Sequence, residues 1–278
     1  MIAESPVTVG EVRTRMLSVT GIGTPVVLLH GYADSADTWR GVLTRLEAMG
    51  RSAFAVDLPG FGRADRRRPG PLLPQFDAFA DAILADRGPA ILVGNSLGAA
   101  TAVRAATRNP DAVHGLVALD DPLNARHWLA RVARSRDVPV RFWSGVGRIP
   151  VPRHAVRWMA RQGVARVLYG TRATPADPVV MAHWTTIFDS QASVAALGRY
   201  AFQYARETAG GHRDIRVCCP TVVVHGARDR IIPVNASRIL HQQIPGSELV
   251  VLSRSGHCPQ LDDPDTVVRL ITGIGGAA

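Results

Sequence analysis

The chain contains no lysine, only three cysteines, and no apolar run that approaches the length of a membrane span. A spanning helix needs about 20 consecutive apolar residues, so none is predicted. Cys218 and Cys219 are adjacent and Cys258 stands apart from both, which is a poor framework for disulfides. Residues 1–6 also lack the basic start and apolar core of a signal peptide. We therefore expect a reducing, cytoplasmic location.

The sequence also lacks the motifs that hold cofactors and metals. Gly21–Gly23 has neither the third glycine nor the following helix of a dinucleotide-binding loop. No group of His, Cys, Asp and Glu has the spacing of a metal site. We therefore expect no metal and no nicotinamide or flavin cofactor.

All 32 basic residues are arginine, and they are unevenly distributed. Residues 122–216 contain 15 arginines and five acidic residues, a net charge of +10, whereas the rest of the chain carries −1. Arginines without a recognisable binding module do not indicate nucleic-acid binding, so no nucleic-acid partner is predicted. The short run of arginines at 66–68 lies in a Pro/Gly-rich stretch and indicates a solvated loop rather than an anion site.

With 278 residues, 46% of them hydrophobic, the chain is long enough for a domain with an insertion. Seven segments have the pattern of strands, mostly short apolar runs without alternation, as in a parallel sheet buried on both faces: Arg15–Val19, Val26–His30, Ser52–Val56, Ala90–Val93, Gly115–Asp120, Thr221–His225 and Ser247–Leu252. Helical patterns lie between several of them, at Thr38–Met49, Phe76–Asp86, Gly98–Thr107 and Asn235–Gln243. This alternation predicts an α/β fold with a mostly parallel, doubly wound sheet.

The alternation stops for about a hundred residues between Asp120 and Thr221. Helical patterns replace it at Arg126–Ser135, Arg153–Tyr169 and Pro178–Glu207, with breaks around Gly145–Pro152 and Gly170–Pro175. The sequence therefore predicts a helical insertion over residues 122–216, between core segments 1–121 and 217–278. The second helix has an apolar face at helical spacing, formed by Val156, Met159, Ala160, Val164, Val167 and Leu168, and a neighbouring stripe formed by Arg153, Arg157 and Arg161.

The strongest motif is Gly94–Gly98, which reads Gly-Asn-Ser-Leu-Gly between an apolar strand and a helical stretch. Glycines allow two backbones to approach closely at such a turn, and the turn exposes the hydroxyl of Ser96. A serine hydroxyl is unreactive unless a base removes its proton. Ser96 is therefore the candidate nucleophile.

The base and its partner are expected downstream. His257 follows a late apolar strand, and imidazole titrates near neutrality, so His257 is the candidate general base. Asp229 follows the preceding strand and is the candidate acid that orients the imidazole. The pair Asp120-Asp121, at the end of the strand after the nucleophile helix, is a rival for that role.

The serine, acid, histidine order resembles the catalytic triad of the α/β-hydrolase superfamily. His30-Gly31-Tyr32 at the end of a strand, Trp39 beyond it and Gly60-Phe61-Gly62 also resemble that family, and the resemblance extends from about Val26 to about Arg269. It implies a helical cap over the site, an antiparallel first strand, and an oxyanion hole formed by the backbone N–H groups of Tyr32 and Leu97. His30, His225 and Trp39 are expected to be structural, and His127, His154 and His183 to lie at the surface.

The predicted function is a cofactor-independent serine hydrolase that cleaves a carboxylic ester or related acyl bond of a small molecule. Two alternatives stay open. Gly94–Ser96 resembles the elbow of carbon–carbon bond hydrolases that act on meta-cleavage products, although residues 32–36 lack their Gly-Pro-Gly. A non-catalytic receptor or scaffold on the same fold is the other alternative.

Enzymes with an aspartate nucleophile are disfavoured by Ser96, and a thiol nucleophile at Cys258 is disfavoured because Ser96 fills that role. The basic insertion is interpreted first as a lid whose apolar helix face covers the site and whose arginines face water. The alternative is that its charge favours anionic substrates or peripheral contact with anionic lipid. Substrate identity and oligomeric state are left open.

Overall fold

In the computed structural model, which describes residues 1–125, 131–132, 140–171 and 176–274, the strands form one sheet in the order β1-β2-β4-β3-β5-β6-β7-β8. The strands are β1 (Ala3–Val9), β2 (Val12–Val19), β3 (Ile22–Leu29), β4 (Arg51–Val56), β5 (Ala90–Asn95), β6 (Val113–Leu119), β7 (Thr221–Gly226) and β8 (Glu248–Leu252). β2 pairs antiparallel with β1 and β4, and all other pairs are parallel. The predicted fold class is confirmed. β1 was not predicted, because its partly exposed residues lack an apolar run.

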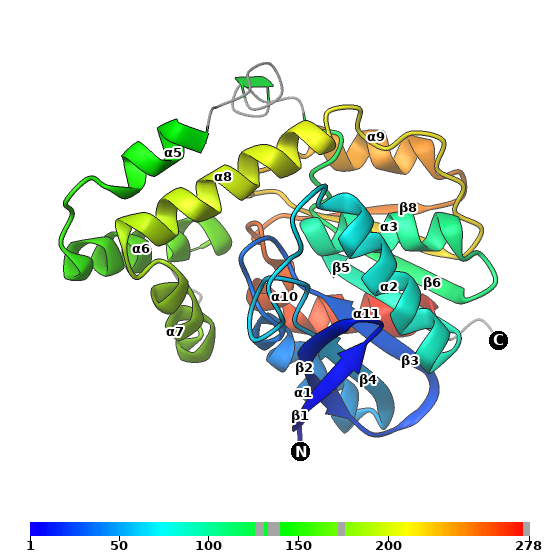
Figure 1. Cartoon of the computed structure of the whole chain (residues 1–278). Helices are drawn as coiled ribbons and strands as arrows, with labels where there is room; N and C mark the ends of the chain where they lie inside the picture. The colour runs from blue at the N-terminus through cyan, green and yellow to red at the C-terminus, as the bar shows by residue number, and fades with distance from the viewer. Residues whose placement is uncertain (126–130, 133–139, 172–175, 275–278) are drawn as a thin grey trace.

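Both faces of the sheet are buried, which explains why the parallel strands are apolar without alternation. Val26 and Leu28 pack on one face with α1 (Arg40–Ala48) and α11 (Pro264–Ile274). Val27 and Leu29 pack on the other. That second face is covered by α2 (Leu73–Arg87), α3 (Leu97–Arg108) and α9 (Asn235–Gln243) (Figure 1). The two clusters are therefore separated by the sheet itself.

Between β6 and β7 the described chain is helical. It forms α5 (Val140–Gly147), α6 (Arg153–Leu168), α7 (Pro178–Ile187) and α8 (Gln191–Glu207), which lie together at one end of the molecule (Figure 1). The helix predicted at 126–135 lies outside the described residues except for 131 and 132, which are helical. No helix of the described chain has the length and apolarity that a membrane crossing needs.

The single helix predicted over Pro178–Glu207 is wrong, because the chain forms two helices that meet at a break. Ser190 is extended, and its hydroxyl accepts a hydrogen bond from the N–H of Ser193 at 3.2 Å. The Ser193 side chain in turn contacts the Ser190 N–H. This reciprocal cap satisfies the free N–H groups of a new helix start. The serines that break the helix were visible in the sequence, but their capping role was overlooked.

α8 is attached to the core at two places. At its C-terminal end the Glu207 carboxylate accepts the N–H groups of Leu72 and Leu73, at the start of α2, over 2.7–2.9 Å. Further along, the Arg67 guanidinium lies between the rings of Phe61 and Tyr200, 4.6 and 4.0 Å from their centroids. The prediction that this arginine run is a solvated loop is therefore wrong for Arg67.

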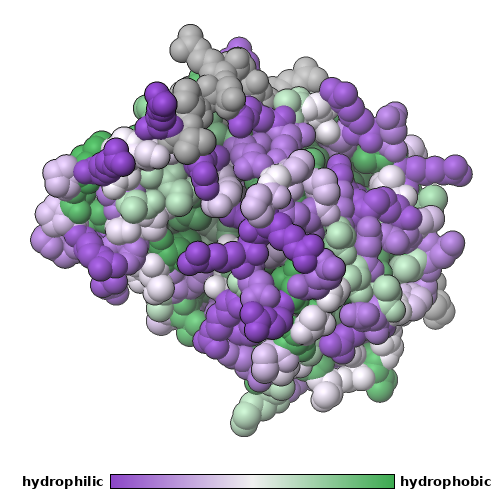
Figure 2. Space-filling view, in the orientation of Figure 1, coloured by the Kyte–Doolittle hydropathy of each residue, from purple (hydrophilic) through white to green (hydrophobic). Residues whose placement is uncertain are grey.

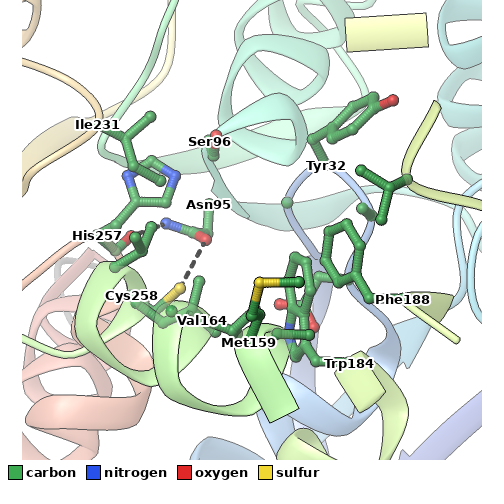
Figure 3. A pocket seen from close by; sticks show the side chains of 18 of the residues that line it. Tyr32, Asn95, Ser96, Met159, Val164, Trp184, Phe188, Ile231, His257 and Cys258 are labelled. Atoms are coloured by element: carbon green, nitrogen blue, oxygen red, sulfur yellow. Dashed lines mark hydrogen bonds between the residues drawn. The ribbon is translucent and has the colours of Figure 1, made fainter. Parts of the chain in front are cut away.

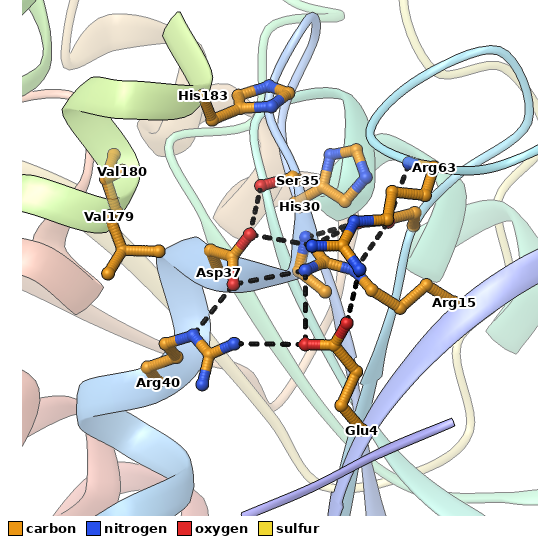
Figure 4. Close-up of polar contacts among 12 residues, drawn as sticks. Glu4, Arg15, His30, Ser35, Asp37, Arg40, Arg63, Val179, Val180 and His183 are labelled. Carbon is orange, nitrogen blue, oxygen red and sulfur yellow. Dashed lines mark hydrogen bonds and ion pairs between the residues drawn. The ribbon is translucent and has the colours of Figure 1, made fainter. Parts of the chain in front are cut away.

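A cluster of buried charges ties the edge of the sheet to the loop before α1 (Figure 4). Arg15 on β2 pairs with Asp57 at 2.9 Å and with Asp37 at 2.7 Å, and all three side chains are at most 9% exposed. Asp57 also accepts the N–H groups of Ala36 and Arg63. Burial opposes ionisation of both carboxylates, but the Arg15 hydrogen bonds together with the other neighbouring donors and charges outweigh it and hold their pKa values below the usual range.

Replacing Arg15 with methionine is expected to lower the free energy of unfolding by about 3–5 kcal/mol, because two buried carboxylates lose their partner. Urea unfolding of the purified variant measures the change. Arg13→Met is the matched control, since the Arg13–Asp65 pair on the same strand is exposed and exposed pairs contribute little. Equal effects of the two substitutions would contradict the expectation.

Candidate active site

The turn after β5 holds Ser96 in a conformation that few residues adopt. Its φ is +54° and its ψ is −117°, and α3 begins at the next residue. The flanking glycines are required by close backbone contacts. A β-carbon on Gly94 would lie 2.2 Å from the carbonyl oxygen of Gly98, and one on Gly98 would lie 2.2 Å from that of Leu29. The motif therefore places Ser96 at the end of β5 with helix α3 directly behind it.

His257 and Asp229 come together on the loops that follow β8 and β7. The imidazole Nδ1 lies 2.7 Å from Oδ2 of Asp229, and the carboxylate is fully buried. Oδ1 of Asp229 accepts the N–H groups of Ile231 and Ile232 at 2.6 and 3.0 Å. Burial alone would raise the pKa of Asp229, but the imidazole and these N–H groups lower it below its usual range. The carboxylate is thus held ionised against Nδ1, which leaves Nε2 to accept a proton.

The rival acids do not contact the imidazole in this way. Asp121 faces away, because its carboxylate binds His212 Nε2 at 3.0 Å and the N–H of Leu123 at 2.9 Å. Asp120 lies behind Asp229, and the ligand atoms of Asp120, Asp229 and His257 are all within 4.8 Å of one another. Such a trio could surround a cation. Because the imidazole and one carboxylate are already hydrogen-bonded to each other, the arrangement suits proton transfer better.

The two backbone N–H groups expected to bind an oxyanion lie on the loop after β3 (Tyr32) and at the start of α3 (Leu97). A β-carbon on Gly31 would lie 3.4 Å from the Ser96 Cβ, so this loop passes directly beside the serine. Within the described chain, the N–H groups of Tyr32 and Leu97 donate to no other group. His30, directly before Gly31, anchors this loop because its Nε2 accepts the Leu58 N–H at 2.9 Å. Burial lowers the pKa of the His30 imidazole to about 4. Both N–H groups therefore belong to segments that lie next to Ser96.

The inserted helices fix the same loop from the other side. The Tyr32 hydroxyl donates to the carbonyl oxygen of Leu197 on α8 at 2.7 Å. Nε2 of His183 on α7 lies 3.0 Å from the carbonyl oxygen of Ala33, a residue with φ of +58°. The prediction that His183 lies at the surface is wrong, because it is partly buried against this loop. His154 is exposed as predicted, and His127 lies outside the described residues.

A cavity of about 540 Å³ lies between these loops and the inserted helices (Figure 3). Ser96, His257 and Tyr32 border it, and its wall is largely apolar. Six predicted members of the apolar face of α6 line it. The lining residues are Gly31, Tyr32, Ala33, Asp34, Asn95, Ser96, Val156, Met159, Ala160, Gly163, Val164, Val167, Leu168, Trp184, Phe188, Gln191, Val194, Ile231, His257 and Cys258. No arginine is among these described lining residues.

Burial raises the pKa values of ionisable side chains in the cavity wall. Burial raises the pKa of Asp34 to about 7, although the Ser35 N–H and the Thr38 hydroxyl oppose the shift. Burial also raises the pKa of the Cys258 thiol well above its usual value. That thiol contacts Oδ1 of Asn95 at 3.6 Å, so Cys258 is a protonated packing residue.

Several cavity residues escaped the sequence analysis. Trp184 and Phe188 on α7 stack with their ring centroids 5.7 Å apart, and their four-residue spacing could have placed them on one helix face. Asp34 and His183 carried no comparable signal. Their positions depend on how the insertion folds back over the loop after β3.

The sheet order, the strained serine after β5 and the paired Asp229 and His257 define the class of α/β-hydrolase folds. The model of the alpha/beta hydrolase family matches residues 26–270. The chain therefore belongs to the alpha/beta hydrolase family.

Its relatives include enzymes named as esterases. A pimeloyl-[acyl-carrier protein] methyl ester esterase of Chromobacterium violaceum is 30% identical over 259 residues, which cover 90% of this chain and 94% of that protein. An esterase of Mycobacterium tuberculosis is 26% identical over 272 residues, covering 90% and 82%. Among solved structures, the 2-hydroxy-6-oxo-6-phenylhexa-2,4-dienoate hydrolase of a Rhodococcus strain has a TM-score of 0.76 at 22% identity, covering 100% and 99% of the two chains. This last likeness concerns the fold.

The conformation of Ser96 leads to a stability prediction. Residues in sparsely populated backbone regions cost about 1–3 kcal/mol, and glycine relieves most of that cost at the expense of about 0.5–1 kcal/mol of chain entropy. Ser96→Gly is therefore expected to be more stable than Ser96→Ala by about 1 kcal/mol. Paired urea unfolding curves measure the difference, and equal midpoints would show that the turn carries no strain.

Proposed function

We propose that this protein is a serine hydrolase that cleaves a carboxylic ester through Ser96, His257 and Asp229. The observation that carries the proposal is the 2.7 Å contact between His257 Nδ1 and the Asp229 carboxylate, on the same cavity as the strained Ser96. The relatives named as esterases support an ester as the substrate. The insertion, residues 122–216, serves as the cap of this site.

In the first half of the reaction, Nε2 of His257 takes the proton of the Ser96 hydroxyl as its oxygen attacks the ester carbonyl carbon. The N–H groups of Tyr32 and Leu97 stabilise the resulting oxyanion. The tetrahedral intermediate collapses, the carbon–oxygen bond to the alcohol breaks, and His257 returns its proton to the leaving alcohol. An acyl-enzyme on Ser96 remains.

In the second half, His257 removes a proton from water as its oxygen attacks the acyl carbonyl carbon. Collapse of the second intermediate breaks the bond to Ser96 and releases the acid. Asp229 keeps the Nδ1 proton in place throughout and stabilises the imidazolium. No cofactor takes part in either half of this scheme.

The composition of the cavity wall supports a neutral, largely apolar acyl chain as the substrate group. The wall includes Val156, Val164, Trp184 and Phe188, and none of its described residues is an arginine that could bind an anion. The anionic-substrate expectation therefore receives no support from the cavity. A screen of p-nitrophenyl esters of increasing chain length, with a vinylogous diketone assayed beside them, separates ester from carbon–carbon bond cleavage.

Ser96→Ala is expected to abolish ester hydrolysis and labelling by a fluorophosphonate probe. Removing the nucleophile of a triad lowers kcat by about 10⁶ in a well-studied serine protease. Asn109→Ala, on the same helix but away from the cavity, is the matched control for expression and folding. A folded Ser96→Ala protein that keeps more than a few per cent of activity would overturn the proposal, and a wild type that is labelled but turns over no ester would indicate a receptor.

We further propose that the exposed face of α6 meets anionic lipid. Trp158 is 65% exposed, and Arg157 and Arg161 on the same helix are exposed as well. Arg153 is engaged by Asp189. Apolar surface is visible among polar side chains at the end of the molecule formed by α5–α8 (Figure 2). An exposed tryptophan flanked by arginines is a feature of helices that bind at the membrane interface.

Changing Arg157 and Arg161 together to glutamine is expected to weaken binding to phosphatidylserine vesicles about 30-fold at low salt, since each arginine near an anionic surface contributes about 1 kcal/mol. Vesicle co-sedimentation measures this. Hydrolysis of a dissolved short ester should not change. The control, a double variant with Arg13→Gln and Arg68→Gln, removes the same charge elsewhere on the molecule. An equal loss of vesicle binding in the control would show that α6 has no specific role in binding.

A further inference from the structure

Asp120 is a buried carboxyl that the reaction scheme leaves without a role. It follows β6, has a φ of +50°, and its side chain is 0% exposed. Oδ1 accepts the N–H of Gly226 at 2.9 Å. Oδ2 is buried and receives no hydrogen bond from a donor in the described part of the chain. Burying a carboxylate oxygen without a hydrogen-bond donor costs free energy, so the protonation state of Asp120 requires an explanation.

The neighbours of Asp120 disfavour a negative charge on it. An oxygen of the Asp229 carboxylate lies within 4.8 Å of an Asp120 oxygen, and Asp262 is a further acidic neighbour. Two buried carboxyls this close do not both ionise. Within the described residues no arginine forms an ion pair with Asp120. The Cys258 thiol, also nearby, stays protonated.

His225 does not supply a compensating positive charge. Its Nε2 lies 3.1 Å from the carbonyl oxygen of Ile232 and therefore carries a proton. Its Nδ1 lies 2.8 Å from the Ser237 hydroxyl, which donates to it in the neutral tautomer. Burial lowers the pKa of His225, which keeps the ring neutral. The 3.3 Å approach of Nδ1 to Oδ1 of Asp120 is thus no ion pair.

The hydrogen bonds also decide which carboxyl keeps the proton. Asp229 accepts from His257 Nδ1 and from two backbone N–H groups, whereas Asp120 accepts from one. More donors stabilise the ionised form. The pKa shifts agree with this difference in donors. Burial and Asp229 raise the pKa of Asp120 well above its usual value, whereas the pKa of Asp229 is lowered.

We propose that Asp120 keeps its carboxyl proton at neutral pH and donates it in a hydrogen bond to Asp229. Asp120 is then a positioning residue that adds a fourth donor to the triad carboxylate and holds it toward His257. Being neutral, it adds no second negative charge behind the imidazole. The inference rests on the proposed roles of Asp229 and His257, but the protonation state itself can be measured without any substrate.

Infrared spectroscopy at about pH 8.5 tests the protonation state, because Asp34, whose pKa is about 7, is then mostly ionised. The wild type should show the carbonyl band of a protonated carboxyl, and Asp120→Asn should lack it. Asp34→Asn is the control and should retain the band. A wild-type spectrum without a band that depends on Asp120 would overturn the proposal, whether or not the protein hydrolyses esters.

Kinetics of two variants test the positioning role. Asparagine tolerates the positive φ and presents an N–H donor to Asp229, so Asp120→Asn should stay within about threefold of wild-type kcat with the acidic midpoint of its pH–rate profile unmoved. Asp120→Gly keeps the backbone but removes the donor, and kcat should fall about tenfold to hundredfold through misplacement of the triad. Thermal unfolding verifies that both variants fold.

Other results of these experiments would contradict the proposal. If Asp120 were ionised, Asp120→Asn would remove a negative charge behind the imidazole and lower the acidic midpoint by about one unit. Equal kcat for the wild type and Asp120→Gly would exclude a positioning role. If the wild-type protein hydrolysed no ester, the proposed function would be refuted. The infrared measurement of the Asp120 protonation state would be unaffected.

Discussion

The close approach of backbone to backbone at the carboxyl edge of the sheet is the constraint on which the rest of the site depends. Gly94 and Gly98 bring the start of α3 against β3. A β-carbon on Gly226 would lie 2.0 Å from the carbonyl oxygen of Gly256, so the loops that carry Asp229 and His257 also approach closely. On the other side, a β-carbon on Gly170 would lie 2.2 Å from the carbonyl oxygen of Arg254, so the end of α6 presses on the same region. Side chains at these positions would push Ser96, Asp229 and His257 apart.

The loop after β3 connects the two parts of the molecule. Its residues 31–34 line the cavity, while its Tyr32 hydroxyl and Ala33 carbonyl contact α8 and α7. The inserted helices therefore shape the cavity and also hold the backbone of this loop. A displacement of α7 or α8 would change the position of the loop, so the two parts of the cavity wall are linked through two hydrogen bonds.

The sequence predicted what depends on local pattern. Apolar runs located the parallel strands to within a few residues. The chain order identified Ser96 and His257, which line one cavity, and Asp229, which contacts the His257 imidazole. What it missed depends on long-range packing. β1 is recognisable only through its pairing with β2, and the placement of His183 follows from how α7 folds back. Arg67 is half-buried because Tyr200 on α8 and Phe61 cover its guanidinium. The break at Ser190 was visible in principle, but helical periodicity on both sides obscured it.

The wall of the cavity is divided between two stretches of chain. The loops at the strand ends contribute Ser96 and His257, and most of the apolar surface comes from α6 and α7. Substitutions at Val164 or Phe188 would reshape the space for an acyl chain without touching the glycines or hydrogen bonds that hold the reacting groups. Selection for a new substrate can therefore act on α6 and α7 while the chemistry is inherited unchanged, which gives this architecture a low evolutionary barrier between related specificities.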